Sequence, residues 1–547
     1  MVWKSNEDWS GRELAKVWHL LVPYTRGRVL DVGAGANRIF PHWVTLDASV
    51  DYGGQRVTDI QARADQPLMF VDASFDAVVS SHCLEHIVDW RSALAEWWRV
   101  VAPGGHLCLY LPHADLYPRC GTPGSNPDHK HDFRPEDILK AMSDLTAATG
   151  QGWTVLEDET RDGGSEYSFL LVFRKRGDDE TVYAPFRKPA KSCMVVRLGA
   201  YGDQIMAASI LPHLKGDGWF VTYMSANPGV SVIQHDPHID AFIIVDKDQI
   251  PNERLGEYWS LMGERYDRIV NLCESIEGQL LTIPGRVNDS YPDEVRRRLC
   301  DVNYLERTHD LAGVPHDFRV RFYPTEMEVE RCRQTVIDAY PGRKALWVLS
   351  GSSVHKTWPH MPQAIVRLLY AVPDLTIILA GDEKCQEMEE VIQDAAVQYF
   401  GTAKRLVRTS GFWPVRATMA LAQQVDVVIG PETGVLNAVC LDEVPKVVFL
   451  SHSSPNMLTK HWRNTVVLTP KGPDAPSCWP CARLHHGWDR CRQDRITGAA
   501  MCQAVITPDQ AVEAVAEALL MRDRPAEEDA AEADGEQAEE PAQLAAE

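Results

Sequence analysis

Four cysteines near the carboxyl end of the chain have the types and spacing that most directly suggest metal chemistry. They follow the pattern C-x2-C-x9-C-x10-C within CWPCARLHHGWDRCRQDRITGAAMC. Thiolates in a C-x2-C pair with two further cysteines suit a tetrahedral site for zinc or iron. The candidate ligands are Cys478, Cys481, Cys491 and Cys502, with His485 and His486 as alternatives. Four reduced thiols in a loop would leave the same pattern, because no second C-x2-C pair is present.

Histidines and acids between residues 82 and 132 suggest a second kind of chemistry. HCLEH, residues 82–86, fits the H-x-x-E-H pattern of some zinc peptidases. That chemistry requires the motif within a helix, whereas here it follows a predicted strand, so we do not assign a zinc site to it. The long polar stretch 112–138 contains HKHDF, in which His129, His131 or Asp132 could accept a proton from a hydroxyl. A surface lid would have the same composition.

These residues must be positioned by α/β elements, and the chain has two places where such a domain begins. RVLDVGAGANRIF, residues 28–40, and VVRLGAYGDQ, residues 195–204, each read as a strand, a glycine turn and a helix. Nucleotide-binding α/β domains begin in this way. Predicted strands and helices alternate to about residue 178, and again from 193 to about 520. The predicted fold class is therefore α/β, with more than one Rossmann-like part.

The first beginning resembles the class I methyltransferases that use S-adenosylmethionine, over roughly residues 10–178. The resemblance rests on LDVGAG, on SSHCLEHI as the end of the fourth strand, and on PGG as the turn before the fifth. It implies an S-adenosylmethionine site formed by Asp31, Gly33, Gly35, Asp47 and Asp59, in which Asp47 holds the ribose and Asp59 contacts adenine. Asn37 stands where a third glycine is often found. His82, His129 and His131 would face the methyl acceptor.

The second beginning resembles glycosyltransferases of the GT-B fold, the family that includes the ADP-heptose–lipopolysaccharide heptosyltransferases. Four stretches occur in the family's order: RLGAYGDQIMAASIL, NLCESIEGQL, GSSVHKTWP and VIGPETGVLNAVC. The resemblance implies two Rossmann-like lobes facing a cleft. In this family cysteine-rich segments are common, and in the autotransporter heptosyltransferases such a quartet holds iron.

The resemblance also implies roles for residues of the cleft. Asp203 would accept the proton of the acceptor hydroxyl, although an acid at this position of a helix is also an ordinary cap. Lys356 would place a positive charge on the departing diphosphate. The residues expected to bind the nucleotide sugar are Gly202, Ser352, Ser353, Lys356, Glu432, Thr433 and Gly434. The family generally acts without a divalent metal in this cleft.

Two departures from the heptosyltransferase pattern weaken the transfer of its donor specificity. Glu432 stands where an aspartate is usual, and Asn437 where a histidine is usual. In the opening stretch, Ser209 replaces a usual proline. The extra methylene of Glu432 shifts its carboxylate by about 1 Å, enough to change which sugar hydroxyls it holds. We therefore expect the donor to be a heptose or a similar sugar on a nucleoside diphosphate.

Length and composition are consistent with a multidomain protein of 547 residues, 45% hydrophobic and 24% charged. We predict a methyltransferase domain at 1–178, a linker at 179–192, lobes at 193–325 and 326–520 with a cysteine-rich segment at 478–502, and a disordered acidic tail at 521–547. No apolar run approaches the roughly 20 residues that span a bilayer, and the amino terminus lacks a signal peptide, so we expect a cytoplasmic protein.

The predicted function is bifunctional: inverting sugar transfer and methyl transfer, both on one glycan or lipid-linked glycan. The net charge of −22 disfavours nucleic acid as a stable partner. S-adenosylmethionine and a nucleotide diphosphate sugar are the expected cofactor and donor, with a structural zinc or iron as a further candidate. Two alternatives remain: a binding or scaffolding protein with one degenerate half, and a glycosyltransferase acting on a protein or nucleobase.

Overall fold

The computed structural model describes residues 13–35, 38–49, 51–52, 55–56, 58–177, 189–246, 248–273 and 287–523. The chain divides into two compact units, Met1–Ser192 with Ile243–Arg268, and Cys193–Phe242 with Ile269–Glu547. Most of the predicted linker and tail, Asn37, and residues 274–280 of NLCESIEGQL lie outside the described residues. The domain boundaries given above stay a prediction.

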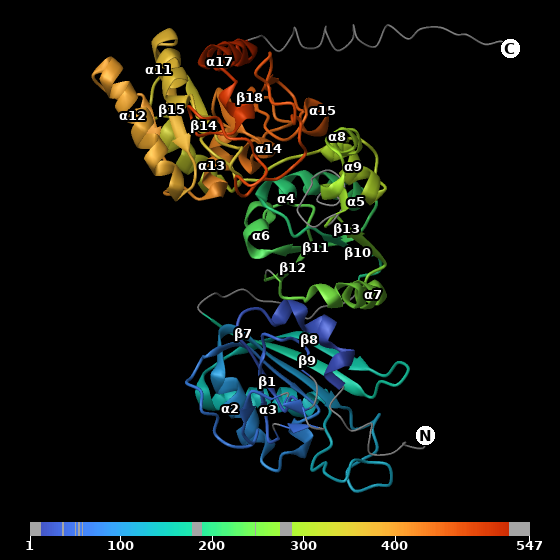
Figure 1. The fold of residues 1–547 in the computed structure, drawn as a ribbon. Helices are drawn as coiled ribbons and strands as arrows, with labels where there is room; N and C mark the ends of the chain where they lie inside the picture. Colours follow the sequence, from blue (N-terminus) through green and yellow to red (C-terminus); the bar gives the residue numbers. More distant parts are fainter. Residues whose placement is uncertain are drawn as a thin grey trace, which may run out of the picture. The chain divides into compact units, whose positions relative to one another are not determined.

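A seven-stranded sheet forms the centre of the first unit (Figure 1). Its order is β5-β2-β1-β6-β7-β9-β8, and the strands run parallel except where β9 pairs with β7 and β8. Their bounds are β1 Val29–Val32, β2 Val44–Asp47, β5 Ile60–Gln61, β6 Phe75–Ser81, β7 Val101–Pro112, β8 Trp153–Arg161 and β9 Ser168–Lys175. The separate pair β3 (Asp51–Tyr52) and β4 (Gln55–Arg56) is antiparallel.

Helices cover both faces of this sheet. Apolar residues of α2 (Trp90–Val100) and α3 (Pro135–Thr149) share one buried cluster with Leu107, Leu109 and Leu111 of β7. Because successive side chains of a strand alternate between faces, His106 points the other way, where Tyr24 of η2 (Val22–Tyr24) packs on it. The central strands are consequently buried on both sides, as their largely apolar sequences predict.

Two local expectations for this unit are wrong. PGG, residues 103–105, is not a turn before the fifth strand but lies within β7, where a bulge shifts the pairing between Phe75–Val101 and Ala77–His106. The expected short helix after the glycine turn is also missing from the described residues between β1 and β2. Only eleven residues separate Val32 from Val44, and a helix so short gains little from its own hydrogen bonds.

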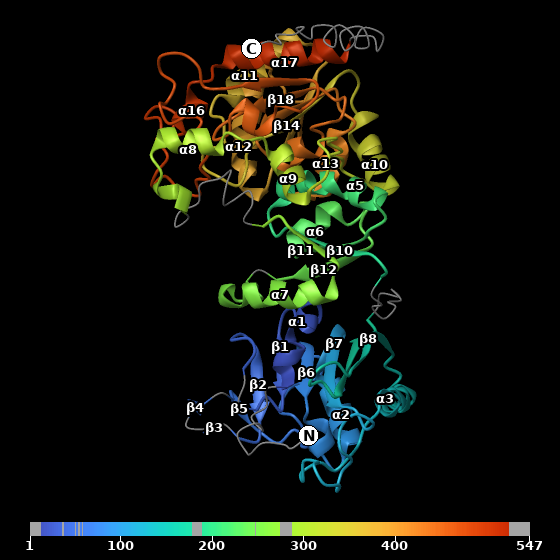
Figure 2. The ribbon, with the colours of Figure 1, turned by 90° about the vertical axis from the view of Figure 1, so that its right-hand side faces the viewer.

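A segment from far along the sequence, residues 243–268, belongs to the first unit. Its helix α7 (Leu255–Arg265) lies beside α1 (Trp18–Leu21) (Figure 2). The rings of Tyr258 and Trp18, one from each helix, are 5.9 Å apart. Arg265 Nη2 donates to Oε1 of Glu157 on β8 over 2.7 Å, and the Tyr24 hydroxyl donates to the same oxygen. Glu157 is 2% exposed, so Arg265 compensates a buried charge.

Two further sheets account for the second half of the chain. A four-stranded sheet has the order β12-β11-β10-β13, with β10 Ser192–Val196, β11 Phe220–Ala226, β12 Ala241–Val245 and β13 Arg268–Asn271. A six-stranded parallel sheet has the order β16-β15-β14-β17-β18-β19. Its strands are β14 Lys344–Val348, β15 Thr376–Ala380, β16 Leu406–Arg408, β17 Val427–Pro431, β18 Lys446–Phe449 and β19 Thr465–Leu468.

The six-stranded sheet is covered on both faces as in a doubly wound fold. Helices α11, α12 and α17 cover one face of the sheet, and α13 and α14 cover the other (Figure 1). Alternate residues of β14 accordingly join two different cores: Ala345 and Trp347 belong to the first, and Leu346 and Val348 to the second. The helices of this half are α10 Glu326–Cys332, α11 Met361–Ala371, α12 Gln386–Phe400, α13 Val415–Ala422, α14 Gly434–Ala438, α15 Pro455–Leu458, α16 Met501–Ala504 and α17 Pro508–Arg522.

The remaining helices lie between β10 and the six-stranded sheet in sequence: α4 Tyr201–Ala207, α5 Leu211–Gly216, α6 Asn227–Ile233, α8 Asp293–Cys300 and α9 Tyr304–Ala312. The predicted fold class is confirmed: α/β, with a Rossmann-like first unit and a two-lobed, GT-B-like second unit. Within the residues that the structure describes, no helix combines the length and apolarity needed to cross a membrane.

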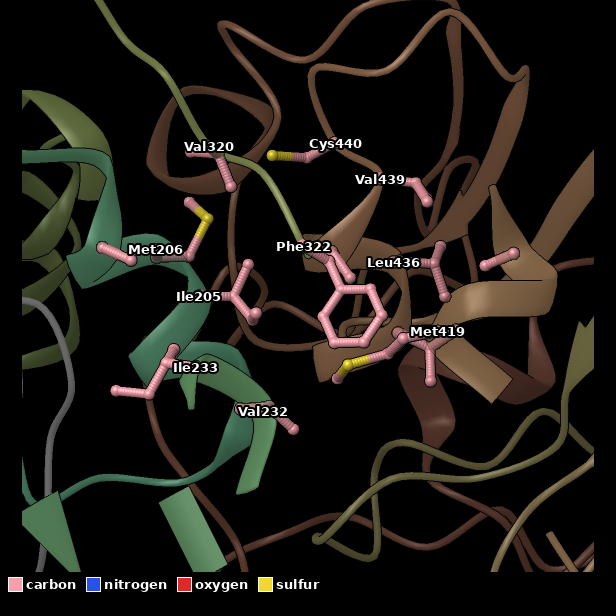
Figure 3. Close-up of a cluster of buried hydrophobic side chains, with 14 of the residues drawn as sticks. Ile205, Met206, Val232, Ile233, Val320, Phe322, Met419, Leu436, Val439 and Cys440 are labelled. Carbon is pink, nitrogen blue, oxygen red and sulfur yellow. The ribbon is translucent and has the colours of Figure 1, made fainter. Parts of the chain in front are cut away.

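One hydrophobic cluster joins the two lobes of the second unit. Ile205 of α4 and Val232 of α6 lie on one side of Phe322, and Met419 of α13 and Leu436 of α14 on the other (Figure 3). All five side chains are at most 2% exposed. The elements that carry the two halves of the predicted cleft therefore share a single core.

The buried pair in the first unit allows a direct test of where residues 243–268 belong. Replacing Arg265 by Met leaves Glu157 buried without its cation, which should destabilise the first unit by about 3–5 kcal/mol. The exposed pair Arg319–Asp317 provides a matched control, and Arg319→Met should cost less than about 1 kcal/mol. Scanning calorimetry would measure both; equal effects of the two substitutions would contradict this packing.

Candidate functional site

A cavity of about 670 Å³ lies in the second unit, a volume within the usual range for small-molecule sites. It is found beyond the carboxyl ends of β14 and β17, neighbouring strands from which the chain continues to opposite sides of the sheet. Ligands of open α/β sheets bind at such a switch point. The predicted residues that line the cavity are Gly202, Asp203, Ser352, Lys356, Glu432, Thr433 and Gly434. Ser353 is buried nearby and is not among the lining residues.

Asp203 enters the cavity from the first turn of α4. Its Oδ2 accepts the Ala200 amide over 2.8 Å, the cap expected from sequence, while Oδ1 lies 2.9 Å from Arg197 Nη2 and accepts the Tyr304 hydroxyl over 2.9 Å. Burial alone would raise the pKa of Asp203, but the charge of Arg197 and the hydrogen bonds outweigh it and hold the pKa below its usual range. The carboxylate is thus fixed and ionised, with 24% of the side chain exposed.

Tyr304 was not found from the sequence. It is the first residue of α9, directly after Asn303, whose side chain caps the helix. Helix-start signals mark Asn303 but say nothing about where the next side chain reaches. The hydrogen bond to Asp203 depends on the packing of α9 against α4, which only the fold supplies.

Lys356 reaches the cavity from the loop after β14. Its Nζ donates to the backbone carbonyl of Glu432 over 2.8 Å, and burial lowers its pKa. Gly351 allows this path, because a Cβ there would lie 2.7 Å from Cδ of Lys356. Ser352 is exposed at the cavity. The ammonium group is therefore anchored by one bond, with further donors available to a ligand.

The carboxylate of Glu432 is engaged by the loop after β18. Oε1 accepts the Ser451 amide over 2.7 Å, Oε2 accepts the Ser453 hydroxyl over 3.2 Å, and His452 Nδ1 lies 2.6 Å from Oε2. Burial would raise the pKa of Glu432, but His452 outweighs it and keeps the pKa well below its usual range. The side chain of Glu432, which is longer than that of an aspartate, thus reaches the loop of residues 451–453 and holds it in position. The backbone carbonyl of Glu432 holds the ammonium group of Lys356.

The amino-terminal ends of α4 and α14 touch at two glycines. A Cβ at Gly434 would lie 2.9 Å from the Gly202 nitrogen, and a Cβ at Gly202 would lie 2.6 Å from Nδ2 of Asn437. Both distances are shorter than real Cβ contacts, so a larger residue at Gly434 requires a shift of the Gly202 backbone, and a larger residue at Gly202 displaces the Asn437 side chain. Asn437, the second departure from the heptosyltransferase pattern, therefore packs against the other lobe.

The glycine turn of the first unit has the conformation that a close-lying ligand requires. Gly33 and Gly35 have φ of 75° and 60°, and a Cβ at Gly33 would lie 2.5 Å from the Cys83 sulfur. The Gly35 amide donates to Oδ2 of Asp47 over 3.0 Å, and the Ser49 amide to Oδ1 over 2.9 Å. Asp47 thus closes the turn at the end of β2.

The other two predicted acids of this site differ in their surroundings. Asp31 is 1% exposed, and its Oδ2 accepts no hydrogen bond within the described part of the chain. Burial, together with the charge of Asp47, raises the pKa of Asp31 to about 7. Asp59 instead accepts bonds from the amide and hydroxyl of Thr45 and pairs with Arg38. Asp31 therefore has one buried oxygen without a partner among the described residues, whereas Asp59 is hydrogen-bonded to Thr45 of β2.

Of the three histidines predicted to face a methyl acceptor, two lie close together in the structure and the third lies apart. His82, directly after β6, and His129 each have a ring nitrogen 3.8 Å from Oε1 of Glu85. His131 is not part of this group, since its Nε2 lies 3.1 Å from the Val88 carbonyl oxygen. The sequence singles out Glu85 only through the H-x-x-E-H pattern. In the structure this pattern begins directly after β6 and ends with the short turn η3 (Leu84–His86), so it does not lie within an α-helix.

The four cysteines of the carboxyl-terminal segment lie near one another. Burial, together with the neighbouring Cys481, Cys491 and Cys478, raises the pKa of Cys502, and burial raises the pKa of Cys481 to about 12. Cys481 Sγ is 3.7 Å from His485 Nε2, one of the alternative ligands. Within the described ranges, three ligand atoms come within 4.8 Å of one another only at Glu85, His86 and His129. The cysteine metal site stays a prediction.

Contact between the two glycines generates a prediction about stability. Gly434→Ala should destabilise the second unit by about 1–3 kcal/mol, because its Cβ overlaps the Gly202 backbone. Gly216→Ala in α5 is the matched control, since a Cβ there meets no atom within 4 Å. Calorimetric unfolding would compare them. If Gly434→Ala is as stable as Gly216→Ala, the lobes do not meet in this way.

Solved structures that resemble the chain include two glycosyltransferases. The glycosyl transferase family 9 protein from Veillonella parvula has 15% identity and a TM-score of 0.44, covering 61% of this chain and 99% of that one. ADP-heptose lps heptosyltransferase II from E. coli has 16% identity and a TM-score of 0.42, covering 61% of this chain and 100% of that one.

Comparison with sequence families concerns the first unit. The chain is 30% identical over 105 residues to the demethylmenaquinone methyltransferase of Deinococcus radiodurans, a match that covers 15% of this chain and 43% of that relative. Residues 30–109 match the model of the methyltransferase domain family. This range contains β1 except for its first residue, together with the glycine turn, β2 and β6. The chain therefore contains a methyltransferase domain in its first unit.

Proposed function

We propose that the chain is a bifunctional enzyme that transfers a sugar in the cavity of the second unit and a methyl group at the glycine turn of the first. The observation that supports sugar transfer most directly is the placement of Asp203 and Lys356, from two different lobes, in the lining of one cavity. The match of residues 30–109 supports methyl transfer. The donors are a nucleotide diphosphate sugar and S-adenosylmethionine.

Lys356 is proposed to stabilise the leaving diphosphate. As the bond between the anomeric carbon and the phosphate oxygen breaks, negative charge grows on that oxygen, and a fixed positive group lowers the energy of this state. The Glu432 carbonyl holds Nζ in place over 2.8 Å. Ser352 and Thr433 line the same part of the cavity and supply hydroxyl groups to the diphosphate. Gly202 and Gly434 are proposed to let the two lobes approach closely at this part of the cavity.

Asp203 is proposed to accept the proton of the acceptor hydroxyl as that oxygen attacks the anomeric carbon. A single displacement of this kind inverts the configuration at that carbon. Arg197 and Tyr304 fix the carboxylate, so its position is set before the acceptor binds. Its lowered pKa makes it a weak base, and the developing acidity of the hydroxyl during attack compensates for this.

Glu432 is proposed to position the loop of residues 451–453 and Lys356, rather than to bind the donor sugar with its carboxylate. Three partners in residues 451–453 occupy its carboxylate. An aspartate would be shorter by one methylene and would not span the same distance. We therefore propose that this chain uses a donor sugar other than the one recognised by its heptosyltransferase-like relatives, with a heptose-like shape.

The residues of the first unit fit S-adenosylmethionine. The positive φ angles of Gly33 and Gly35 form a turn without side chains, and Asp31 offers a buried oxygen without a partner to a cationic group. When bound, the cofactor supplies an electrophilic methyl group on a sulfonium. Asp47 would hold the ribose hydroxyls after releasing the Gly35 amide, and Asp59, tied to Thr45, would border the adenine. The residues orient the cofactor, and the histidines near Glu85 lie on the acceptor side.

Both reactions are proposed to act on one glycan or lipid-linked glycan. The covalent linkage of the two units supports this, because a fused pair of transferases keeps successive steps on one substrate close together. Mass spectrometry of the product would test it. A methylated product that carries no transferred sugar would contradict the shared pathway.

Release of nucleoside diphosphate from a panel of ADP-, UDP-, GDP- and CDP-sugars would test the second unit. One donor should be turned over slowly with water as acceptor, and Lys356→Ala should lower this rate by about 10²–10³-fold because the leaving group loses its cation. Asp203→Ala should lower the rate with the true acceptor by about 10²–10⁴-fold. The exposed Lys404→Ala is the control and should leave the rate unchanged.

If no nucleoside diphosphate is released, measurements of donor binding distinguish the possible reasons. Donor binding with no release, even with acceptor extracts, would favour a non-catalytic second unit. Absence of binding by every donor would contradict sugar transfer altogether. Equal rates for Lys356→Ala and Lys404→Ala would contradict the role of Lys356.

Affinity for S-adenosylmethionine should depend on the ionisation of Asp31. A cationic ligand favours the ionised carboxylate, and with a pKa of about 7 the carboxyl is mostly protonated at pH 5.5. The Kd should therefore be at least about tenfold larger at pH 5.5 than at pH 7.5. Asp31→Asn should bind weakly at both pH values and lose most of this difference. Calorimetry with the exposed Asp144→Asn as control would measure it; an unchanged pH dependence in Asp31→Asn would rule out this role.

A further inference from the structure

Three potential metal ligands meet beside the glycine turn of the first unit. Oε1 of Glu85 lies 3.8 Å from Nε2 of His86 and 3.8 Å from Nε2 of His129. These ligand atoms all lie within 4.8 Å of one another. Two atoms that each bind one metal at about 2.1 Å are themselves about 3–4 Å apart, so little movement would bring the three into one coordination sphere.

Glu85 is a buried carboxylate that the rest of the described structure does not satisfy. It is 0% exposed, and neither of its oxygens accepts a hydrogen bond from another described residue. Burying a carboxylate without a hydrogen bond or a cation costs several kcal/mol, so such groups are usually paired or bound to a metal. His82 also faces it, with Nδ1 3.8 Å from Oε1, while its Nε2 is 2.9 Å from the Ser168 hydroxyl.

The loop that carries His129 is attached to the turn that carries Glu85. The amides of Lys130 and His131 donate to the Glu85 carbonyl over 2.8 and 3.2 Å. The rings of His86 and His129 lie edge to face, with their centroids 4.7 Å apart. The ligands are thus brought together by backbone bonds that do not involve a metal, and the site is preformed.

We infer that Glu85, His86 and His129 bind a divalent transition metal ion, with His82 available as a fourth ligand. Two imidazoles and one carboxylate suit Zn²⁺, Fe²⁺, Co²⁺ or Mn²⁺, and three protein ligands leave a coordination position open. The side chain of His86 is 33% exposed, whereas Glu85 is fully buried, so the open position is reached from the His86 side. This site is separate from the cysteine segment and contains no sulfur.

The position of the site indicates what it would bind. Cys83, two residues before Glu85, touches Gly33, so the metal would lie next to the proposed cofactor site at the same edge of the sheet. An oxygen of the methyl acceptor, from a hydroxyl or a carboxylate, is the ligand class that completes such a coordination sphere. This assignment of the acceptor rests on the proposed methyl transfer, whereas the metal site itself does not.

Cobalt binding to the full-length, chelator-treated protein would test the site. Co²⁺ bound by imidazole and carboxylate should give visible d–d bands without the near-ultraviolet charge-transfer band that thiolates add. Glu85→Gln and His129→Gln should weaken this binding by at least 100-fold, since even loss of an outer partner weakens metal sites by 10–100-fold. His131→Gln, from the same loop, is the control and should bind as wild type. Elemental analysis of the protein as purified would identify the native metal.

The outcomes distinguish the metal site from the proposed function. Binding that is lost in Glu85→Gln and His129→Gln but retained in His131→Gln supports the site, even if no methyl transfer is ever detected. Thermal unfolding checks that the variants fold, and the near-isosteric Glu85→Gln removes only the charge. Because the cysteine segment can also take up Co²⁺, the decisive spectrum is the difference between wild type and Glu85→Gln. Absence of sulfur-free d–d bands from this difference, or equal affinity in Glu85→Gln and wild type, would overturn the inference.

Discussion

The second unit depends on the close approach of two helix starts. Gly434 lies so close to Gly202 that a Cβ at Gly434 would overlap the Gly202 backbone, and this contact fixes where Asp203 and Thr433, their next neighbours, can point. Beneath it, Phe322 packs between Ile205 and Leu436, so the two lobes share one core (Figure 3). The cavity, its carboxylate and its ammonium group follow from this arrangement.

In the first unit, as in the second, the candidate site lies where two neighbouring parallel strands lead to opposite faces of a sheet. β1 and β6 are neighbours from which the chain continues to opposite sides, and Gly33 and His82 follow their carboxyl ends. The backbone at His82 is itself unusual, with φ of 47°, and it directs the following turn so that Glu85 is buried beneath the loop of His129. A positive φ in a histidine is uncommon and costs energy, which is consistent with a functional constraint on this turn.

Sequence reasoning succeeded where local signals determine the structure. β14 was predictable from its apolar run KALWV, and the turns at Gly33 and Gly199 from glycines that follow strands. β19 was missed, because a four-residue strand at the sheet edge with only half-buried residues leaves a weak pattern. Contacts between distant segments could not be predicted: the partners of Glu432 in residues 451–453, Tyr304 beside Asp203, and His129 beside Glu85 all depend on which strands are neighbours. The packing of residues 243–268 with the first unit is of the same kind.

The central claim is that residues from two lobes form one nucleotide-sugar site, and hydrogen–deuterium exchange with nucleoside diphosphates tests it most directly. The nucleoside diphosphate that binds should slow the exchange of peptides around 199–204, 350–357 and 432–437 together. Peptides around 81–87 and 113–133 should keep their exchange rates. Addition of S-adenosylmethionine should protect residues 30–49 and leave the cavity peptides unchanged. Protection confined to one lobe, or none with any of the four nucleotides, would contradict the account.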